Sequence, residues 1–288
     1  MPRKTTSSVF LLLLVCSFLG LADGKKTRIV TSFYPMYIAT LNITDGVQGV
    51  EVSNMTRQIS GCLHDYQLTP DDMKTISNAD IFVVNGAGME SFMDKVIKEK
   101  PNLKIVVASE GMELIRGAGE PNPHVWVSIS LHARQIANIA AGLSKFDPSN
   151  ADAYRKNADA YIGRLSALSK KMNEELKDLK TRDIITFHEA FPYFAREFKL
   201  NIAAVIEREP GSEPDAREMA KTIDLIRKSK VKVLFAEPQY SQKSAEAISR
   251  ETGAKLFILD PAVGGPSEPG AYLAIMEKNL EVLKKAMK

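Results

Sequence analysis

Cysteine and histidine are scarce in this sequence. Its 288 residues include two cysteines and four histidines. Cys16 lies in an N-terminal apolar segment that we expect to be removed, which leaves Cys62 alone in the mature chain. An intramolecular disulfide is then excluded. Stability must come from a hydrophobic core, and a hydrophobic content of 44% is enough to form one.

The sequence also lacks an excess of charge and a long apolar run. Its 38 basic and 35 acidic residues are spread along the chain, without the basic patch that nucleic-acid binding needs. The longest apolar run, Val9 to Leu21, falls short of the roughly 20 residues of a transmembrane helix. We therefore expect a soluble monomer with no nucleic-acid partner and no stable membrane insertion.

The N-terminus is typical of an export signal. Two basic residues precede the apolar run, and small residues near Ala22 supply a cleavage site for a signal peptidase. We assign residues 1–24 as a signal peptide and predict a periplasmic protein. A lipid anchor on Cys16 is the less favoured alternative, because Val15 is too bulky for the usual lipobox.

From Lys26 onward, short apolar runs rich in β-formers alternate with amphipathic segments. The runs in the first half are Arg28–Phe33, Val47–Val52, Asp80–Asn85 and Lys104–Ala108. Those in the second half are Asp183–Phe187, Ile202–Ile206, Lys232–Ala236 and Lys255–Leu259. Helices are expected over Met89–Lys98, Leu131–Phe146, Ala216–Lys228 and Ser244–Thr252. This alternation predicts two α/β lobes, residues 25–146 and 181–288, each with a four-stranded parallel sheet.

One long helix is expected between the lobes. Asp147 and Pro148 form a suitable N-cap and first-turn pair, and apolar residues then recur from Tyr154 to Met172 at spacings of four and three. A helix from Pro148 to Leu179 would be about 48 Å long at 1.5 Å per residue. We interpret residues 147–180 as a rigid linking helix rather than a coiled coil, because the apolar repeat ends with the helix.

Three histidines lie at or beyond the ends of expected strands. His64 follows the second strand, His124 follows the fourth and His188 closes the fifth. Asp260 directly follows the eighth strand. Since ligands of open α/β sheets bind outside the carboxyl ends of the strands, these side chains are on the functional edge. His132 lies inside an amphipathic segment, and we interpret it as a solvated helix residue.

Three imidazoles and one carboxylate would form a four-coordinate site that suits zinc. Some sixty or more positions separate these residues, so no short motif indicates that they lie together. A hydrogen-bonded structural histidine therefore stays an alternative at each position.

Six stretches of the chain form an ordered set of motifs. They are His64–Pro70 (HDYQLTP), Asn122–Val127 (NPHVWV), Phe187–Phe194 (FHEAFPYF), Glu209–Pro214 (EPGSEP), Phe235–Gln239 (FAEPQ) and Leu259–Pro261 (LDP). This set resembles the metal-binding solute-binding proteins of cluster A-I, which serve zinc and manganese ABC importers. The resemblance covers nearly the whole mature chain.

The resemblance implies two lobes tied by one long helix, with the metal in the cleft between them. It implies that His64 and His124 from the first lobe, and His188 and Asp260 from the second, bind the metal. The expected function is capture of Zn²⁺, with Mn²⁺ as the alternative, and its delivery to an ABC permease with a cytoplasmic ATPase. The protein would then not be an enzyme. Manganese-type members tend to carry a carboxylate where this chain has His188, which favours zinc.

Several interpretations stay open at this stage. Cys62 is either a substitute ligand or a structural thiol, and Glu237 is either an acceptor for a ligand histidine or a solvated loop acid. Trp126 is expected to pack under the site. Two functions from other classes are a zinc metallohydrolase, with Glu237 or Glu189 as the base, and a surface adhesin.

Overall fold

The computed structural model describes residues 26–56, 63, 66–93, 96–97, 100–117, 119–206, 215–239 and 242–288. The expected signal peptide lies outside these residues, and so do Cys16, Cys62, His64 and the Glu209–Pro214 motif. Among the helices that are described, none has a stretch long and apolar enough to cross a bilayer.

The first half of the chain forms a parallel sheet with the strand order β2-β1-β3-β4. Its strands are β1 (Thr27–Thr31), β2 (Val50–Asn54), β3 (Ile81–Val84) and β4 (Lys104–Val107). Every residue of β3 is buried, as expected for a strand inside a parallel sheet with both faces covered. The helices of this half are α1 (Tyr34–Thr44), α2 (Pro70–Ser77) and α4 (Ile129–Phe146). Of the expected helix Met89–Lys98, the described residues show the 3-10 turn η1 (Ser91–Met93) and helical residues at 96–97.

The second half forms another parallel sheet, with the strand order β10-β9-β7-β8. Its strands are β7 (Asp183–Thr186), β8 (Asn201–Val205), β9 (Val233–Ala236) and β10 (Lys255–Ile258). Its helices are α6 (Pro192–Phe198), α7 (Ala216–Ser229), α8 (Lys243–Thr252) and α9 (Ala271–Met287). The prediction of an α/β fold with two four-stranded parallel sheets is confirmed. The structure also contains a short antiparallel hairpin that was not predicted. It pairs two strands of two residues each, β5 (Arg116–Gly117) and β6 (Glu120–Pro121).

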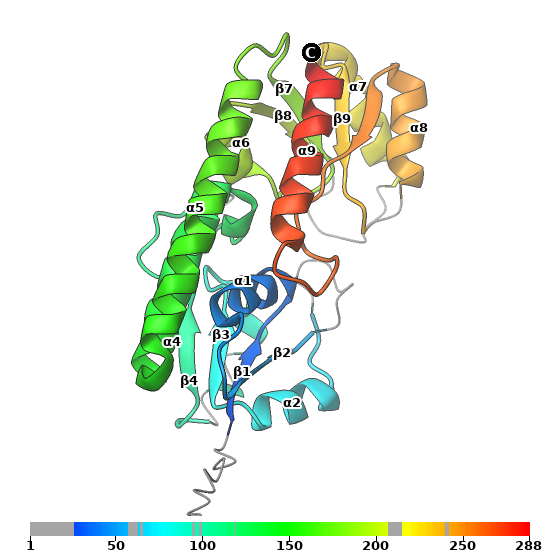
Figure 1. The fold of residues 1–288 in the computed structure, drawn as a ribbon. Coiled ribbons are helices and arrows are strands. Elements are labelled where there is room, and N and C mark those ends of the chain that lie inside the picture. The colour runs from blue at the N-terminus through cyan, green and yellow to red at the C-terminus, as the bar shows by residue number, and fades with distance from the viewer. Residues whose placement is uncertain are drawn as a thin grey trace, which may run out of the picture.

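The long helix α5 (Ala151–Glu175) passes beside both sheets (Figure 1). Its buried residues are the apolar positions that the sequence repeat identifies: Tyr154, Ala158, Tyr161, Leu165, Leu168 and Met172. The 3-10 turn η3 (Pro148–Asn150) precedes it, and the Asp147 carboxylate accepts hydrogen bonds around this turn. The helix ends at Glu175 rather than at Leu179. The guanidinium of Arg182, which directly precedes β7, donates hydrogen bonds to the carbonyls of Leu176 and Lys177 just after the helix.

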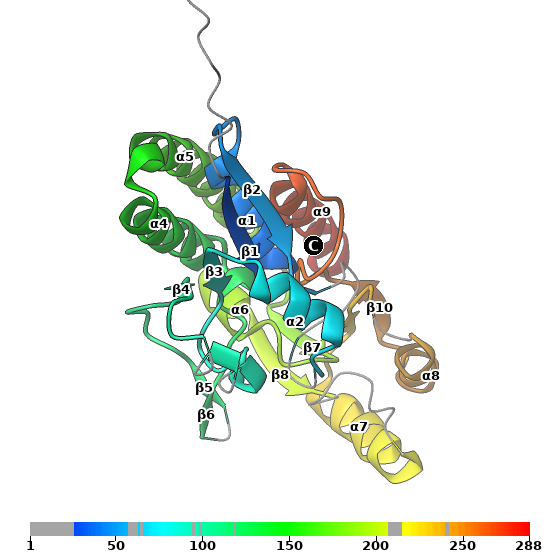
Figure 2. The same ribbon diagram turned by 90° about the horizontal axis from the view of Figure 1, so that it is seen from below.

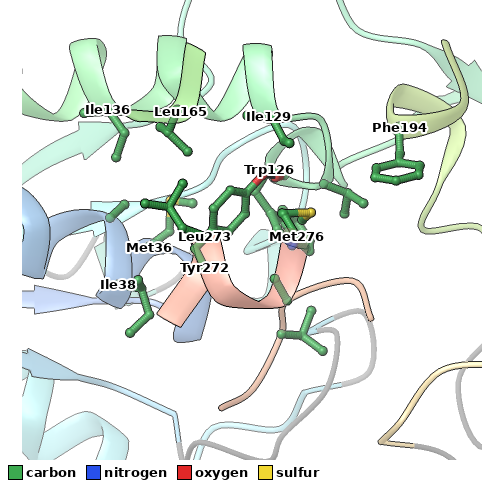
Figure 3. Close-up of a cluster of buried hydrophobic side chains, with 14 of the residues drawn as sticks. Met36, Ile38, Trp126, Ile129, Ile136, Leu165, Phe194, Tyr272, Leu273 and Met276 are labelled. Atoms are coloured by element: carbon green, nitrogen blue, oxygen red, sulfur yellow. Dashed lines mark hydrogen bonds between the residues drawn. The ribbon is translucent and has the colours of Figure 1, made fainter. Parts of the chain in front are cut away.

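The main hydrophobic core is continuous between the two halves. It includes residues of both sheets together with residues of α1, α4, α5 and α9. Seen from below, α4 and α5 lie side by side, and α1 lies between α5 and α9 and contacts both (Figure 2). Trp126 and Tyr272 meet in the middle of this core, among side chains of α1, α4 and α5 (Figure 3). A shared core resists wide separation of the halves, because opening would expose apolar surface to water.

The prediction that His132 is solvated is wrong. Its side chain is fully buried in α4, on the helix face that also carries Ile129, Ile136 and Leu143. The ring lies 4.2 Å from the Tyr272 ring, centroid to centroid, and Nδ1 lies 3.2 Å from Gln135 Oε1. Tyr161 of α5 and Tyr272 of α9 both pack near the ring, so a polar residue at this core-facing position is buried.

Burial lowers the pKa of His132 to about 4 from its usual 6.5. The unfolded chain therefore takes up a proton below pH 6.5 while the folded chain does not, so stability falls as the pH drops from about 6.5 toward about 4. Between pH 7 and pH 5 this group should remove about 2 kcal/mol from the free energy of unfolding.

Urea unfolding of metal-free protein at both pH values measures the effect. His132→Gln, which has no titrating ring, should be less stable at pH 7 but should lose about 2 kcal/mol less than the parent on acidification. An equal loss in both proteins would contradict the assignment.

Candidate metal centre

The carboxyl ends of strands from both sheets meet at one place in the fold. His124 follows β4 and the β5–β6 hairpin, and His188 lies two residues beyond β7. The two imidazole rings are 4.8 Å apart between centroids, with an interplanar angle of 84°. Each residue is only 2% exposed. The structure therefore brings together two predicted ligands that are far apart in the sequence and follow strands of different sheets.

The acceptor beside His188 determines which ring nitrogen carries the proton. His188 Nδ1 lies 3.1 Å from Oε1 of Glu237, which follows β9 and is 1% exposed. The other carboxylate oxygen accepts a hydrogen bond from the Gln239 amide. An ionised carboxylate only accepts, so the neutral form of His188 carries its proton on Nδ1 and has its lone pair on Nε2, the nitrogen available to a metal ion. Glu237 is therefore an acceptor for His188, and the alternative of a solvated loop acid is excluded.

His124 is oriented in a similar way by an uncharged partner. Its Nδ1 lies 3.0 Å from the Asn122 side-chain oxygen, which also accepts the backbone N–H of His124 at 3.0 Å. The ring packs against Trp126, with 5.2 Å between centroids. Trp126 is fully buried beneath it, as predicted, and its Nε1–H donates to the Pro261 carbonyl at 2.8 Å.

Asp260 lies two residues beyond β10 and is held by hydrogen bonds to its backbone and side chain. Its backbone N–H and carbonyl both bind the Asn279 side chain of α9, at 2.9 and 2.7 Å, and its Oδ1 accepts the Ala262 N–H. Burial, the largest effect, raises the pKa of the Asp260 carboxyl. The negative charge of Glu237 raises it further, while the Ala262 N–H and Lys278 lower it. Asp260 and Glu237 thus interact electrostatically, and a divalent cation near them would offset their mutual repulsion.

The described residues supply only part of the predicted ligand set. His64 lies outside them, although Leu63 is fully buried in the main core and accepts the Tyr66 backbone N–H. In the described ranges, no three His, Cys, Asp or Glu side chains form a group that could hold a metal ion. Within these ranges, the candidate centre consists of His124 and His188, each with a hydrogen-bond acceptor at Nδ1. Nitrogen donors of this kind suit zinc and other transition metals better than calcium or magnesium.

Comparison with known proteins identifies the family. The family model described as zinc-uptake complex component A, periplasmic, matches residues 29–286. The high-affinity zinc uptake system protein ZnuA of Bacillus subtilis is 33% identical over 98% of this chain and 95% of its own length.

Two further proteins extend the comparison. The zinc-binding lipoprotein AdcA of Streptococcus pneumoniae is 31% identical over 95% of this chain, which spans 58% of AdcA. The solute-binding protein FpvC of Pseudomonas aeruginosa, in complex with Mn²⁺, superposes with a TM-score of 0.83 at 34% identity, over 91% of this chain and 98% of FpvC. Because the family model covers residues 29–286 of the 288, the chain belongs to the ZnuA family of metal-binding solute-binding proteins of ABC importers, which bind and do not catalyse.

Proposed function

We propose that this protein captures a single Zn²⁺ ion outside the cytoplasm and delivers it to the membrane permease of an ABC importer. The observation that carries the proposal is the buried pair His124 and His188, each with an acceptor at Nδ1. The ring centroids are 4.8 Å apart, which is close enough for one metal ion to bind both rings.

The proposed ligand set is His64, His124, His188 and Asp260. Three nitrogen donors and one oxygen donor match the preference of zinc for tetrahedral sites, whereas manganese prefers more oxygen donors. One relative is named as zinc-binding and a structural relative is in complex with Mn²⁺. This difference is consistent with a shared fold in which the donor atoms of each protein set its metal preference. In this proposal residues 25–146 and 181–288 are the two metal-binding lobes, and residues 147–180 link them. Residues 1–24 would direct export to the periplasm.

We expect one tightly bound zinc ion per chain. The purified protein, stripped of metal, would be titrated with zinc against a chromogenic chelator, and the bound metal measured by elemental analysis. The same titration with manganese should give weaker binding, because zinc ranks above manganese at nitrogen-rich sites. Absence of stoichiometric zinc binding would refute the proposal. A metal with an open, water-filled position together with peptide or ester hydrolysis would favour the metallohydrolase instead.

A further inference from the structure

Asn122 joins the two histidine-bearing segments of the candidate centre. It is 6% exposed and lies two residues before His124. Its Nδ2 donates to the carbonyl of Glu189, the residue after His188, at 2.8 Å. Its own carbonyl accepts the hydroxyl of Tyr193, on α6, at 2.7 Å. The side chain and the backbone carbonyl of Asn122 therefore attach the segment that carries His124 to the segment that carries His188.

The orientation of the Asn122 amide follows from its neighbours. The Glu189 carbonyl can only accept, so the amide nitrogen of Asn122 must face it. The backbone N–H of His124 can only donate, so the amide oxygen must face that group. Two independent partners thus require the same orientation, and Oδ1 is left beside Nδ1 of the His124 ring.

This orientation determines the tautomer of His124. An amide oxygen only accepts, so the nearby Nδ1 of the neutral ring must carry the proton and Nε2 the lone pair. Tyr193 extends the same network, because its hydroxyl oxygen also accepts the Ile115 N–H at 2.9 Å. The Asn122 N–H in turn donates to the Ile115 carbonyl at 2.7 Å. These bonds join Ile115 to Asn122 across the loop before His124, and they join both residues to Tyr193 of α6.

We propose that Asn122 is a positioning residue that sets the tautomer of His124 and fastens the His124 segment to the His188 segment, so that both imidazoles present Nε2 as a preformed pair. The inference rests on the proposed metal-binding function. These bonds run between protein groups and need no metal to form. A pair that is already oriented loses little conformational entropy when the metal binds, which raises affinity.

Two substitutions separate the two roles. Asn122→Ala removes both the acceptor for His124 and the donor to Glu189. Asn122→Asp keeps an oxygen acceptor beside His124 but places a second oxygen against the Glu189 carbonyl. The matched control is Asn157→Ala, because Asn157 also donates to two backbone carbonyls, those of Ile43 and Asp45, without contacting a histidine.

Nitrogen NMR of the histidine rings in the metal-free protein at about pH 8, where imidazole is neutral, reads the tautomer directly. The parent, Asn122→Asp and Asn157→Ala should show His124 protonated on Nδ1, and Asn122→Ala should show a mixture with the Nε2–H form. Zinc affinity by chelator competition should fall about 10–100-fold in Asn122→Ala, as for other residues that orient ligands. Asn122→Asp should also lose affinity, and Asn157→Ala should match the parent.

An Asn122→Ala variant that is folded by circular dichroism, keeps the Nδ1–H form and binds zinc within about twofold of the parent would overturn the inference. If Asn122→Ala does not fold, parent-like zinc affinity in Asn122→Asp would overturn it. Failure of the parent itself to bind zinc would refute the proposed function, while the NMR comparison would still test whether Asn122 sets the tautomer.

Discussion

Replacement of His188 by alanine is expected to weaken zinc binding by at least about a hundredfold. Loss of a residue that merely orients a ligand costs about 10–100-fold in metal affinity, and loss of the ligand itself should exceed that range. The variant also leaves the Glu237 carboxylate without its imidazole partner. Chelator competition with the purified variant measures the loss. Zinc binding like that of the parent would show that His188 is not a ligand.

His188→Glu tests the choice of metal with the same residue. The change keeps a donor at the position but replaces nitrogen by oxygen, so the ratio of zinc to manganese affinity should fall at least about tenfold, or roughly 1.4 kcal/mol. The structure adds one complication, because the new carboxylate would face Glu237. The variant should therefore also be made together with Glu237→Gln, which removes this repulsion. Asn173→Glu, an exposed change on α5 that adds the same charge, is the control and should leave the ratio unchanged.

Trp126→Ala is expected to destabilise the protein by about 3–5 kcal/mol, the usual cost of truncating a large buried aromatic residue. Trp126 is fully buried and packs edge-on against Phe33 at 5.0 Å between centroids. Its backbone carbonyl accepts the Tyr272 hydroxyl at 2.7 Å, and its indole N–H binds the Pro261 carbonyl. Since it is the only tryptophan, unfolding in urea must be followed by circular dichroism rather than by fluorescence.

Two further variants separate the contributions of Trp126. Trp126→Phe keeps an aromatic ring but leaves the Pro261 carbonyl without the indole donor, so it should cost about 1–3 kcal/mol. Leu225→Ala removes a large apolar side chain that is 45% exposed, and it should change stability by less than about 0.5 kcal/mol. A loss below about 1 kcal/mol in Trp126→Ala would contradict a central role in the shared core.

Local patterns predicted most of the fold. Each of the eight expected strands overlaps an observed one, because continuous apolar runs such as β3 (IFVV) suit strands buried on both faces. The buried face of α5 follows from its spacings of four and three. These features depend on side chains that are near one another in the sequence, so periodicity alone identifies them. Placing His188 just beyond β7 likewise needed only the strand assignment, whereas His124 lies beyond a hairpin that was not predicted.

The same local patterns could not decide whether a polar residue on a helix is buried. His132 shares a face with Ile129 and Ile136 at helical spacing, a signal that could have suggested burial. An amphipathic helix has one face toward the core and one toward water. The sequence of that helix alone does not decide whether a polar residue next to the apolar face is covered by another element. Contact with Tyr272 of α9 decided the matter for His132.

The sequence by itself determined two parallel α/β sheets, a long helix between them and the place of His188 at a strand end. The acceptor of His124 is local, since Asn122 lies two residues before it, but the contacts that hold Asn122 and His188 were decided only by the tertiary structure. Asn122 and Glu189 are 67 positions apart, and His188 and Glu237 are 49 apart. The first of these bonds depends on how the two halves pack against a shared core, and the second depends on the pairing of β7 with β9. No local periodicity encodes either. The tautomers that orient both rings are therefore a property of the folded chain.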